Sequence, residues 1–369
     1  MSHGAAADPG ERAGRVAAQL ADQGIDALLI ERLVDVRYVT GFTGSSGLAV
    51  VRATAGDGHL FLTDFRYRTQ SAEQVSDAFA REIAAGELLD AAAAALGSAG
   101  GRLGFDPSSV TVAAHGRLRE QLDNAWELVP CRDVVAGLRR VKDSAELARI
   151  AAAAELADAA LGGVLEGGLA GRTEHEVAVE LELRMRKLGA EEPSFGSIVA
   201  AGAHGALPHA EPRDVEIPRD VLVTIDWGAR HDGYCSDCTR TYATGEGISQ
   251  LARDVYALVL DAQQKGLGAV RAGAGGRDVD AVAREVIAAG GHGEHFGHGL
   301  GHGVGMEVHE GPRLSRTAGD EPLQAGNVVT VEPGVYLPGE LGVRIEDLVV
   351  VTDGQAEVLT GLSTALTVI

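Results

Sequence analysis

The sequence predicts an α/β domain over residues 1–138, followed by an α+β domain with an antiparallel sheet over residues 139–369. The chain has 369 residues, which suits two domains at about 100–200 residues each. Strand and helix patterns alternate in the first part, whereas helices and glycine-rich, strand-like segments make up the second. The charged stretch Arg139–Asp143 interrupts the alternation and marks the boundary.

The first domain is predicted from short apolar runs that alternate with helical patterns. Residues 11–23 fit a helix that ends at Gly24, and residues 26–30 fit a strand. Further strands are expected at 47–51 and 59–62, and further helices at 87–96 and 113–122. This alternation is typical of an α/β fold.

Two helices of the second domain begin with the sequence pattern of a capping box. Asp143 precedes a long predicted helix, and Glu146 lies three residues after Asp143, as the capping box requires. Thr173 and Glu176 repeat the pattern, and Gly189 is the expected end of that second helix. Two further helices are expected at 251–265 and 279–289. The segments between and after these helices are glycine-rich and strand-like, so an antiparallel sheet is predicted.

Composition and charge exclude several classes of protein. The formal net charge is −21, which disfavours nucleic acid and anionic membranes as partners, because both require basic patches. No apolar run approaches the ~20 residues of a membrane span, and Met1–Arg15 contain no apolar segment of a signal peptide. Three cysteines do not make a disulfide framework. A soluble cytoplasmic protein is therefore expected.

Two aspartates lie on either side of a predicted turn. The apolar run 221–225 leads into Asp226, turn residues follow at His231 and Asp232, and Asp237 lies in the next strand-like stretch. In a hairpin that turns near residues 231 and 232, positions 226 and 237 lie across from each other. Two carboxylates this close are unfavourable unless a cation lies between them.

Two glutamates repeat this arrangement near the C-terminus. The apolar run 328–331 leads into Glu332, Pro338 and Gly339 supply a turn, and Glu346 lies in the following apolar run. A turn centred near Gly339 places Glu332 opposite Glu346. The second domain is therefore expected to contain two hairpins, each with a facing pair of carboxylates.

A cluster of histidines lies between the two hairpins. Five of the twelve histidines fall within residues 292–309. The run 297–305 alternates glycine with larger residues, so an extended chain would place His298, Leu300 and His302 on one face. The glycines between them permit a close approach of the backbone to other groups.

The candidate metal ligands are four carboxylates and one imidazole: Asp226, Asp237, His302, Glu332 and Glu346. Such a set suits two hard-to-borderline divalent ions such as Mn²⁺ or Co²⁺. Two ions about 3.5–4 Å apart can deprotonate a shared water and polarise a carbonyl. His209 and His309 are left as donors for the carbonyl oxygen or the leaving group.

Each signal also has a simpler explanation. A strand-end acid next to glycine or proline is commonly a turn or surface residue, and a glycine- and histidine-rich run is commonly a flexible loop. Cys235 and Cys238 have the spacing of a redox or zinc pair, but on a strand they point to opposite faces. The glycine run 297–305 lacks the strand and helix of a nucleotide-binding fingerprint, and no Gly-x-Ser-x-Gly elbow supports a serine hydrolase. Spacing alone leaves the metal site and the structural explanation both open.

At these residues the sequence resembles the pita-bread metallopeptidases, a family that includes methionine aminopeptidase, aminopeptidase P and prolidase. The matching pieces are Ile-Asp226-Trp-Gly through Ser-Asp237-Cys-Thr-Arg-Thr, Gly-His302-Gly-Val-Gly-Met-Glu-Val-His309-Glu, Val-Glu332-Pro-Gly, and Arg344-Ile-Glu346-Asp. Residues 24–29, 36–47 and 63–67 look like the creatinase/prolidase-type N-terminal domain, which methionine aminopeptidases lack. Residues 193–195 through 207–210 look like the Xaa-Pro group, and the resemblance runs from about residue 11 to 365. It implies a curved antiparallel pita-bread sheet in the second domain.

The resemblance also implies a role for each matching residue. The five candidate ligands would hold two metal ions, with Asp237 and Glu346 bridging them and Glu332 also moving the proton of the attacking water. His209 and His309 match family histidines that assist substrate binding and proton movement. His298 matches a further histidine beside the substrate channel, and Arg344 an arginine that supports Glu346 at the substrate side. The only departure is Cys238, where a small or aliphatic residue is expected.

The implied function is hydrolysis of the bond before proline, in dipeptides or at the N-terminus of longer peptides. Mn²⁺ is the expected ion, with Co²⁺ or Zn²⁺ as alternatives. A peptide with proline at its second position is the expected partner, and a homodimer is the expected assembly. Two alternatives remain: an N-terminal exopeptidase of the methionine aminopeptidase kind, and a non-catalytic binding relative, although the full ligand set argues against the second.

Overall fold

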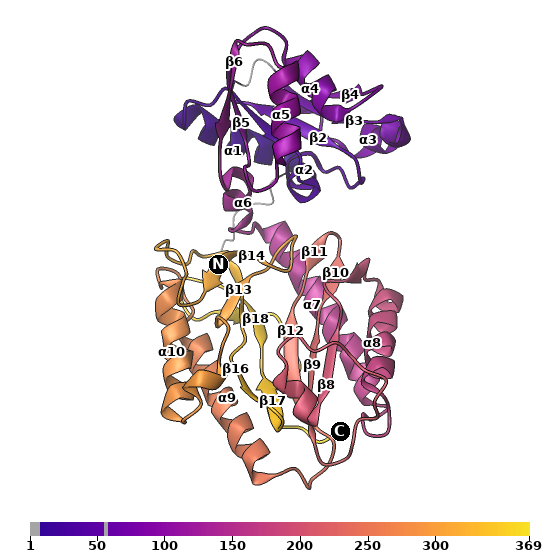
Figure 1. Ribbon diagram of the computed structural model, residues 1–369, viewed down its shortest axis with the longest axis vertical. Helices are drawn as coiled ribbons and strands as arrows, with labels where there is room; N and C mark the ends of the chain where they lie inside the picture. Colours follow the sequence, from indigo (N-terminus) through magenta and orange to yellow (C-terminus); the bar gives the residue numbers. More distant parts are fainter. Residues whose placement is uncertain (1–7, 55–57) are drawn as a thin grey trace. The chain divides into compact units, whose positions relative to one another are not determined.

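The computed structural model describes residues 8–54 and 58–369 of the chain (Figure 1). These residues form two compact units, of which the first ends at Arg139 and the second runs from Arg140 to Ile369. The first residues of the predicted N-terminal domain, and of the stretch judged to lack a signal peptide, lie outside the described part. Each unit is described by itself below.

The N-terminal unit is built on one mixed six-stranded sheet in the order β4-β3-β2-β1-β5-β6. Its strands are β1 (Ala27–Ile30), β2 (Leu48–Arg52), β3 (His59–Thr63), β4 (Phe79–Ile83), β5 (Gly101–Phe105) and β6 (Trp126–Pro130). Its helices are α1 (Pro9–Asp22), α2 (Leu33–Thr40), α3 (Arg68–Gln74), α4 (Leu88–Leu96), α5 (Val112–Gln121) and α6 (Val134–Arg139). The predicted α/β class is confirmed, and α1 begins before the predicted residue 11 because Asp8 and Glu11 form a capping box around Pro9.

The described part of the C-terminal unit contains four long helices, of which the first two carry the caps that the sequence predicts. They are α7 (Ser144–Leu165), α8 (Glu174–Leu188), α9 (Gln250–Ala269) and α10 (Gly276–Ala289). Both predicted capping boxes are present, and Gly189 ends α8 in the left-handed conformation. None of the described helices is long and apolar enough to cross a membrane.

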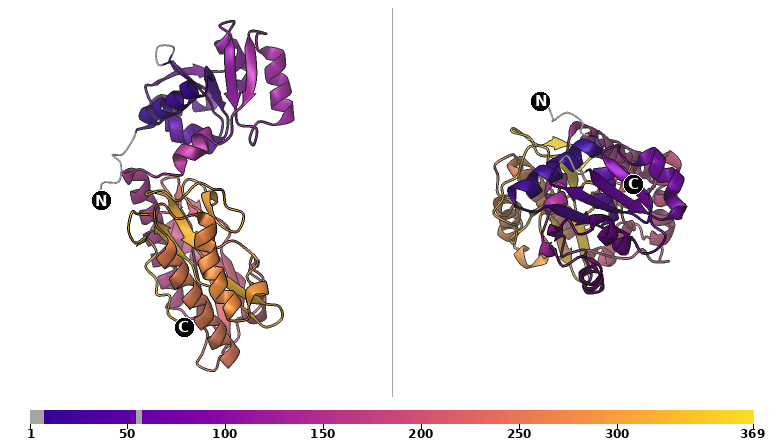
Figure 2. Two further views of the ribbon diagram at one scale, coloured as in Figure 1. Left: turned by 90° about the vertical axis from the view of Figure 1, so that its left-hand side faces the viewer. Right: turned by 90° about the horizontal axis from the view of Figure 1, so that it is seen from above.

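The strands of the C-terminal unit pair in antiparallel fashion, as predicted. The strands of the first half are β7 (Glu192–Pro193), β8 (Ile198–Ala201), β9 (Leu222–Trp227), β10 (Ala229–His231), β11 (Tyr234–Cys235) and β12 (Cys238–Ala243). Those of the second half are β13 (Gly301–Gly303), β14 (Glu310–Leu314), β15 (Val328–Val331), β16 (Gly334–Leu337), β17 (Leu341–Arg344), β18 (Asp347–Val350) and β19 (Glu357–Val358). Figure 2 (left) shows this unit with α9 and α10, in orange, in front of the strands.

Each half of the sheet buries one face against its own pair of helices. Val223 and Ile225 of β9 pack with residues of α7 and α8, whereas Val329 and Val331 of β15 pack with residues of α9 and α10. Successive residues of a strand point to opposite faces. The alternate residues of these strands, which include Asp226, therefore lie on the faces that the helices leave free.

The first acidic hairpin has a different register from the one predicted. Asp226 pairs with Thr239, so Asp237 is diagonal to Asp226 on the same face and does not lie directly across from it. The two loop residues are Asp232 and Gly233, with φ of 47° and 80°. Both residues have the positive φ of the two-residue loop that joins twisted strands, so the hairpin turns one residue later than predicted.

The second acidic hairpin has the predicted register. Pairs Val331–Asp347 and Gly334–Arg344 lie on either side of the glutamates, so Glu332 and Glu346 stand opposite each other around the turn at Gly339. One prediction nearby is wrong: Leu300 packs into the core with Val331 and does not share a face with His302, because the extended strand begins only at Gly301.

Candidate metal centre

One cross-strand row of the sheet brings the two hairpins together. Asp226 pairs with Thr239, an isolated bridge joins Thr239 to Glu346, and Glu346 lies opposite Glu332. Asp237 precedes Thr239 by two residues and so shares its face. One oxygen from each of Asp226, Asp237 and Glu346 can be chosen so that all three lie within 4.8 Å of one another.

His302 adds the imidazole that was predicted for this cluster. Its Nε2 lies 3.3 Å from Oε1 of Glu332 and 3.6 Å from Oδ2 of Asp237. Its Nδ1 lies 3.1 Å from the carbonyl oxygen of Gly303, which fits an Nδ1–H that donates to that oxygen. Such a bond leaves the lone pair of Nε2 directed at the carboxylates, as in most histidine metal sites. The structure therefore brings all five candidate ligands together.

The electrostatics of this cluster call for a cation. Burial, together with the charges of Glu346, Asp226 and Glu332, raises the pKa of Asp237 well above its ordinary value. Burial and the neighbouring carboxylates likewise raise the pKa of Glu346, and burial raises the pKa of Glu332 to about 8. Among the described residues, Oδ1 of Asp226 is buried without a hydrogen-bond partner. Closely spaced carboxylates with an orphaned oxygen fit divalent cations, whose charge would favour their ionised forms.

The nearby histidines are held neutral by their surroundings. Burial lowers the pKa of His302 to about 4, with a smaller contribution from His309. Burial lowers the pKa of His298 to about 4 as well. A neutral imidazole is the form that binds a metal ion, so His302 is ready to act as a ligand at neutral pH.

Two threonines support the glutamates, and neither was predicted. Oγ1 of Thr239 donates to Oε2 of Glu346 at 2.7 Å, and Oγ1 of Thr330 donates to Oε1 of Glu332 at 3.1 Å. Thr330 also accepts from the backbone N–H of His302. Thr239 lies two residues after Asp237, and Thr330 two before Glu332. The two-residue period of a strand could have revealed both.

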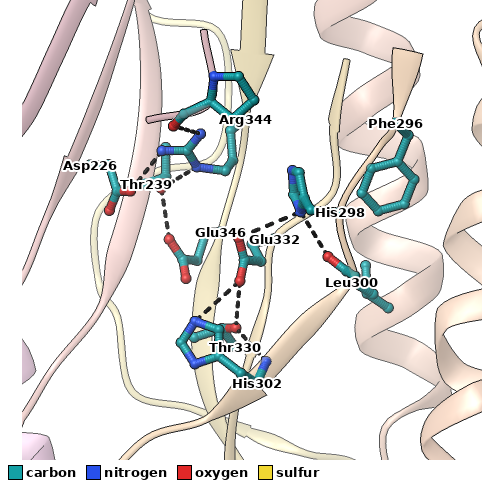
Figure 3. A network of polar contacts seen from close by, with 12 residues as sticks. Asp226, Thr239, Phe296, His298, Leu300, His302, Thr330, Glu332, Arg344 and Glu346 are labelled. Carbon is teal, nitrogen blue, oxygen red and sulfur yellow. Dashed lines mark hydrogen bonds and ion pairs between the residues drawn. The ribbon is translucent and has the colours of Figure 1, made fainter. Parts of the chain in front are cut away.

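Arg344 ties the row to the segment that carries His209. Its Nη2 donates to Oδ2 of Asp226 at 2.6 Å and its Nε donates to Oγ1 of Thr239 at 3.0 Å (Figure 3). Its Nη1 donates to the carbonyl of Pro208 and to the Tyr336 hydroxyl. Arg344 therefore supports Glu346 through Thr239 rather than by direct contact.

Tyr336 is a third site residue that was not predicted from the sequence. Its buried hydroxyl accepts from Arg344 and lies 2.9 Å from Nε2 of His298. His298 Nδ1 lies 3.9 Å from Oε2 of Glu332. Tyr336 thus connects the predicted substrate-side residues His298 and Arg344 at the edge of the carboxylate cluster.

His209 and His309 lie at the exposed side of the site. The ring of His309 packs against that of His302 with centroids 4.3 Å apart. Burial lowers the pKa of His309, with a smaller lowering contribution from His209.

The cysteines take no part in this cluster. Cys131, Cys235 and Cys238 are all buried and free. Sγ of Cys238 points to the carbonyl of Glu346 and contacts Arg240, in the core on the opposite side from the carboxylates. A redox or zinc pair is therefore not formed.

Comparison with known proteins agrees with this geometry. Residues 148–353 match Metallopeptidase family M24, and residues 12–141 match the Creatinase/Prolidase N-terminal domain. The chain is 44% identical over 338 residues to the uncharacterized peptidase YqhT of Bacillus subtilis, which covers 91% of this chain and 94% of the relative. Among solved structures it is similar to the Xaa-Pro dipeptidase from Bacillus anthracis, with a TM-score of 0.93 and 38% identity over 98% of this chain and 100% of the other. It is also similar to the X-Pro aminopeptidase from Thermotoga maritima, with a TM-score of 0.86 and 36% identity over 94% and 98% of the two chains.

The chain therefore belongs to metallopeptidase family M24 and is a metallopeptidase. Within that family it has the creatinase/prolidase N-terminal domain joined to a pita-bread catalytic domain. The predicted fold class and family are both confirmed.

Proposed function

We propose that the enzyme hydrolyses the peptide bond that precedes proline, using two divalent metal ions. The observation that carries this proposal is the convergence of four carboxylates and His302 on the helix-free face of the sheet. The choice of substrate is supported by the similarity to an Xaa-Pro dipeptidase and an X-Pro aminopeptidase over nearly the whole chain. A methionine aminopeptidase would not be expected to contain the N-terminal domain.

The donor set favours Mn²⁺, with Co²⁺ or Zn²⁺ as alternatives. Four carboxylates and one imidazole make an oxygen-rich site, which suits harder divalent ions better than a thiolate site would. Asp237 and Glu346, at the centre of the cluster, would hold the ions together with Asp226, His302 and Glu332. Bound ions would supply Lewis acidity, which lowers the pKa of a water and polarises a carbonyl.

The protein's own residues position the substrate and move the proton. We assign Glu332 the role of accepting a proton from the attacking water and passing it on, because its carboxylate borders the cluster next to His302. His309 and His209 donate to the carbonyl oxygen and steady the proline side of the substrate. His298 borders the substrate channel, and Arg344 holds Asp226 and the segment before His209 in place.

Hydrolysis of three peptides by the Mn²⁺-loaded enzyme tests this proposal. An Xaa-Pro dipeptide, an Xaa-Pro-Xaa tripeptide and Met-Ala-Ser are compared with and without a chelator. Cleavage before proline that the chelator abolishes and Mn²⁺ restores is expected, and the ratio of dipeptide to tripeptide cleavage separates a dipeptidase from an aminopeptidase. Cleavage of Met-Ala-Ser alone would indicate a methionine aminopeptidase-like enzyme, and cleavage of none a binding protein. Light scattering of the purified enzyme tests the proposed homodimer.

A further inference from the structure

A single buried carboxylate closes the loop that carries His209. The loop leaves the sheet at Ala201, the last residue of β8, and returns to the N-terminus of α8 at Arg213. Glu174, the first residue of α8, lies between these two ends. Its side chain is only 1% exposed.

Glu174 contacts both ends of the loop. At the first end, Oε1 accepts from the backbone N–H of Ala201 at 2.9 Å, and Oε2 lies 2.9 Å from Nδ1 of His204. At the second end, Oε2 accepts from the backbone N–H and the Nε of Arg213, both at 3.1 Å, and Oε1 accepts from its Nη2. Two segments 12 residues apart in sequence are thereby fixed to one carboxylate.

The charge of Glu174 is matched to this role. Burial alone would raise its pKa, but the bonds from Arg213, Ala201 and His204 hold the pKa below its ordinary value. Its place in the first turn of α8 also favours a negative charge. A buried carboxylate that ties backbone groups in this way restricts the loop more than an exposed ion pair would.

The middle of the same loop is held against the active-site strands. Arg344 donates to the carbonyl of Pro208, immediately before His209. Gly205 packs so closely on Gly342 of β17 that a side chain at Gly342 would collide with the Gly205 carbonyl. The side chain of Glu174 therefore ties both ends of the loop, where the backbone N–H of His175 also donates to the carbonyl of Arg213, while Arg344 and the Gly205–Gly342 contact hold the middle.

We infer that Glu174 is a positioning residue that fixes His209 for catalysis from outside the metal centre. The inference rests on the proposed function, since it takes His209 as a substrate-binding residue. The hydrogen bonds of Glu174 go to Ala201, His204 and Arg213 and not to the candidate metal ligands, so its removal is expected to change the placement of His209 while the carboxylate cluster stays intact. Nothing local in the sequence links Glu174 to the His209 loop, because its side chain meets the two ends of that loop only in the folded chain.

The test is a double-mutant cycle in the Mn²⁺-loaded enzyme. Glu174→Gln is expected to lower kcat/KM for an Xaa-Pro substrate by up to about 100-fold, as a displaced catalytic group does, while the metal content stays at the wild-type value. In the His209→Ala background the same substitution is expected to have almost no further effect. Equal effects of Glu174→Gln in both backgrounds, or an unchanged kcat/KM, would overturn the inference.

Glu180→Gln is the matched control on the same helix. Glu180 forms ion pairs with Arg172 and Arg184, both of which lie outside the 201–213 loop. The Glu180→Gln variant is expected to leave kcat/KM unchanged within about twofold, since a partly exposed ion pair contributes little to the stability of the fold. Glu174→Asp, which keeps the charge, is expected to recover part of the loss. If Glu174→Gln does not fold, Arg213→Met removes the two side-chain bonds at one end of the loop but keeps the backbone N–H bond, and it is expected to show a smaller loss with the same dependence on His209.

Hydrogen exchange separates a failure of this inference from a failure of the proposed function. Amides of residues 202–212 are expected to exchange faster in Glu174→Gln than in wild type or Glu180→Gln, whether or not Xaa-Pro peptides are cleaved. Unchanged exchange in that segment contradicts the inference even in an active enzyme. Faster exchange in Glu174→Gln, in an enzyme that cleaves none of the three peptides, would support the closing of the loop by Glu174 and contradict the proposed cleavage before proline.

Discussion

The two acidic hairpins of the catalytic domain use the same device with different registers. In the second hairpin Glu332 lies directly opposite Glu346, whereas in the first Asp226 lies opposite Thr239 and Asp237 is displaced by two residues. Both registers leave every acid on the face without helices, because an even displacement does not change the face. The carboxylates can therefore cluster when they share one face of the sheet, even where two of them do not lie directly opposite each other.

The two hairpins also differ in their neutralising partners. Asp226 of the first hairpin receives a hydrogen bond from Arg344, which belongs to the second hairpin. Asp237 and Glu346 instead lie among other carboxylates, and burial together with the charges of these neighbours raises the pKa of each. A bound cation is therefore expected to matter most for these two residues, one from each hairpin.

The largest expected effect comes from removing either central acid. Asp237→Ala and Glu346→Ala are each expected to lose metal and Xaa-Pro peptidase activity together, because both residues lie at the centre of the cluster. Metal content by elemental analysis and activity with added Mn²⁺ measure the two losses. Full activity in a metal-free variant would exclude the dinuclear mechanism. If Asp237→Ala kept both ions while Glu346→Ala lost them, the site would depend on acids that lie directly opposite each other, as in the second hairpin.

A smaller effect is expected from the arginine that links the hairpins. Arg344→Lys cannot bond Asp226, Thr239 and Tyr336 at once, so the metal affinity is expected to fall by about 10–100-fold, as for other residues that orient ligands. Titration of the metal-free enzyme with Mn²⁺ measures this change. Arg230→Lys, at an exposed ion pair of the first hairpin, is the control and should bind Mn²⁺ normally.

The metal-free enzyme is expected to lose stability as the pH rises. Glu332 has a pKa of about 8 in the folded protein against an ordinary value of 4.5, so the folded state binds its proton more tightly. The stability that this proton contributes is present below about pH 4.5 and is lost as the pH rises through 8. Between about pH 5 and 9 the melting temperature is expected to fall in the metal-free enzyme and to change less with Mn²⁺ bound. If the melting temperature changed with pH in the same way with and without Mn²⁺, no bound cation would be compensating the negative charges of the carboxylates.

The smallest effects are expected from the two supporting threonines. Thr239→Val removes the 2.7 Å bond to Glu346 and an acceptor of Arg344, whereas Thr330→Val removes the 3.1 Å bond to Glu332. Thr239→Val is expected to weaken Mn²⁺ binding by about 10-fold, and Thr330→Val by less. Titration of the metal-free variants with Mn²⁺ measures both affinities. A larger loss of Mn²⁺ affinity in Thr330→Val than in Thr239→Val would contradict this prediction.

Much of the candidate site could be predicted because its signals are local. Asp226, Glu332 and Glu346 follow or interrupt apolar runs, and the turn at Gly339 alone sets the register that faces Glu332 with Glu346. The register of the first hairpin was predicted one residue too early at the turn, because positive φ at Asp232 and Gly233 selects those two as the loop. Thr239 and Thr330 could have been found from the two-residue period of their strands.

The sequence by itself determined the capped helices, the two acidic hairpins, the ligand types and, by resemblance, the metallopeptidase family. These depend on contacts between residues close together in the chain, where spacing and turn chemistry limit the outcome. Only the tertiary structure decided that Thr239 bridges to Glu346, that Arg344 reaches Asp226, and that Glu174 closes the His209 loop. These contacts join distant segments, which are held together because the helix-facing sides of the sheet are buried.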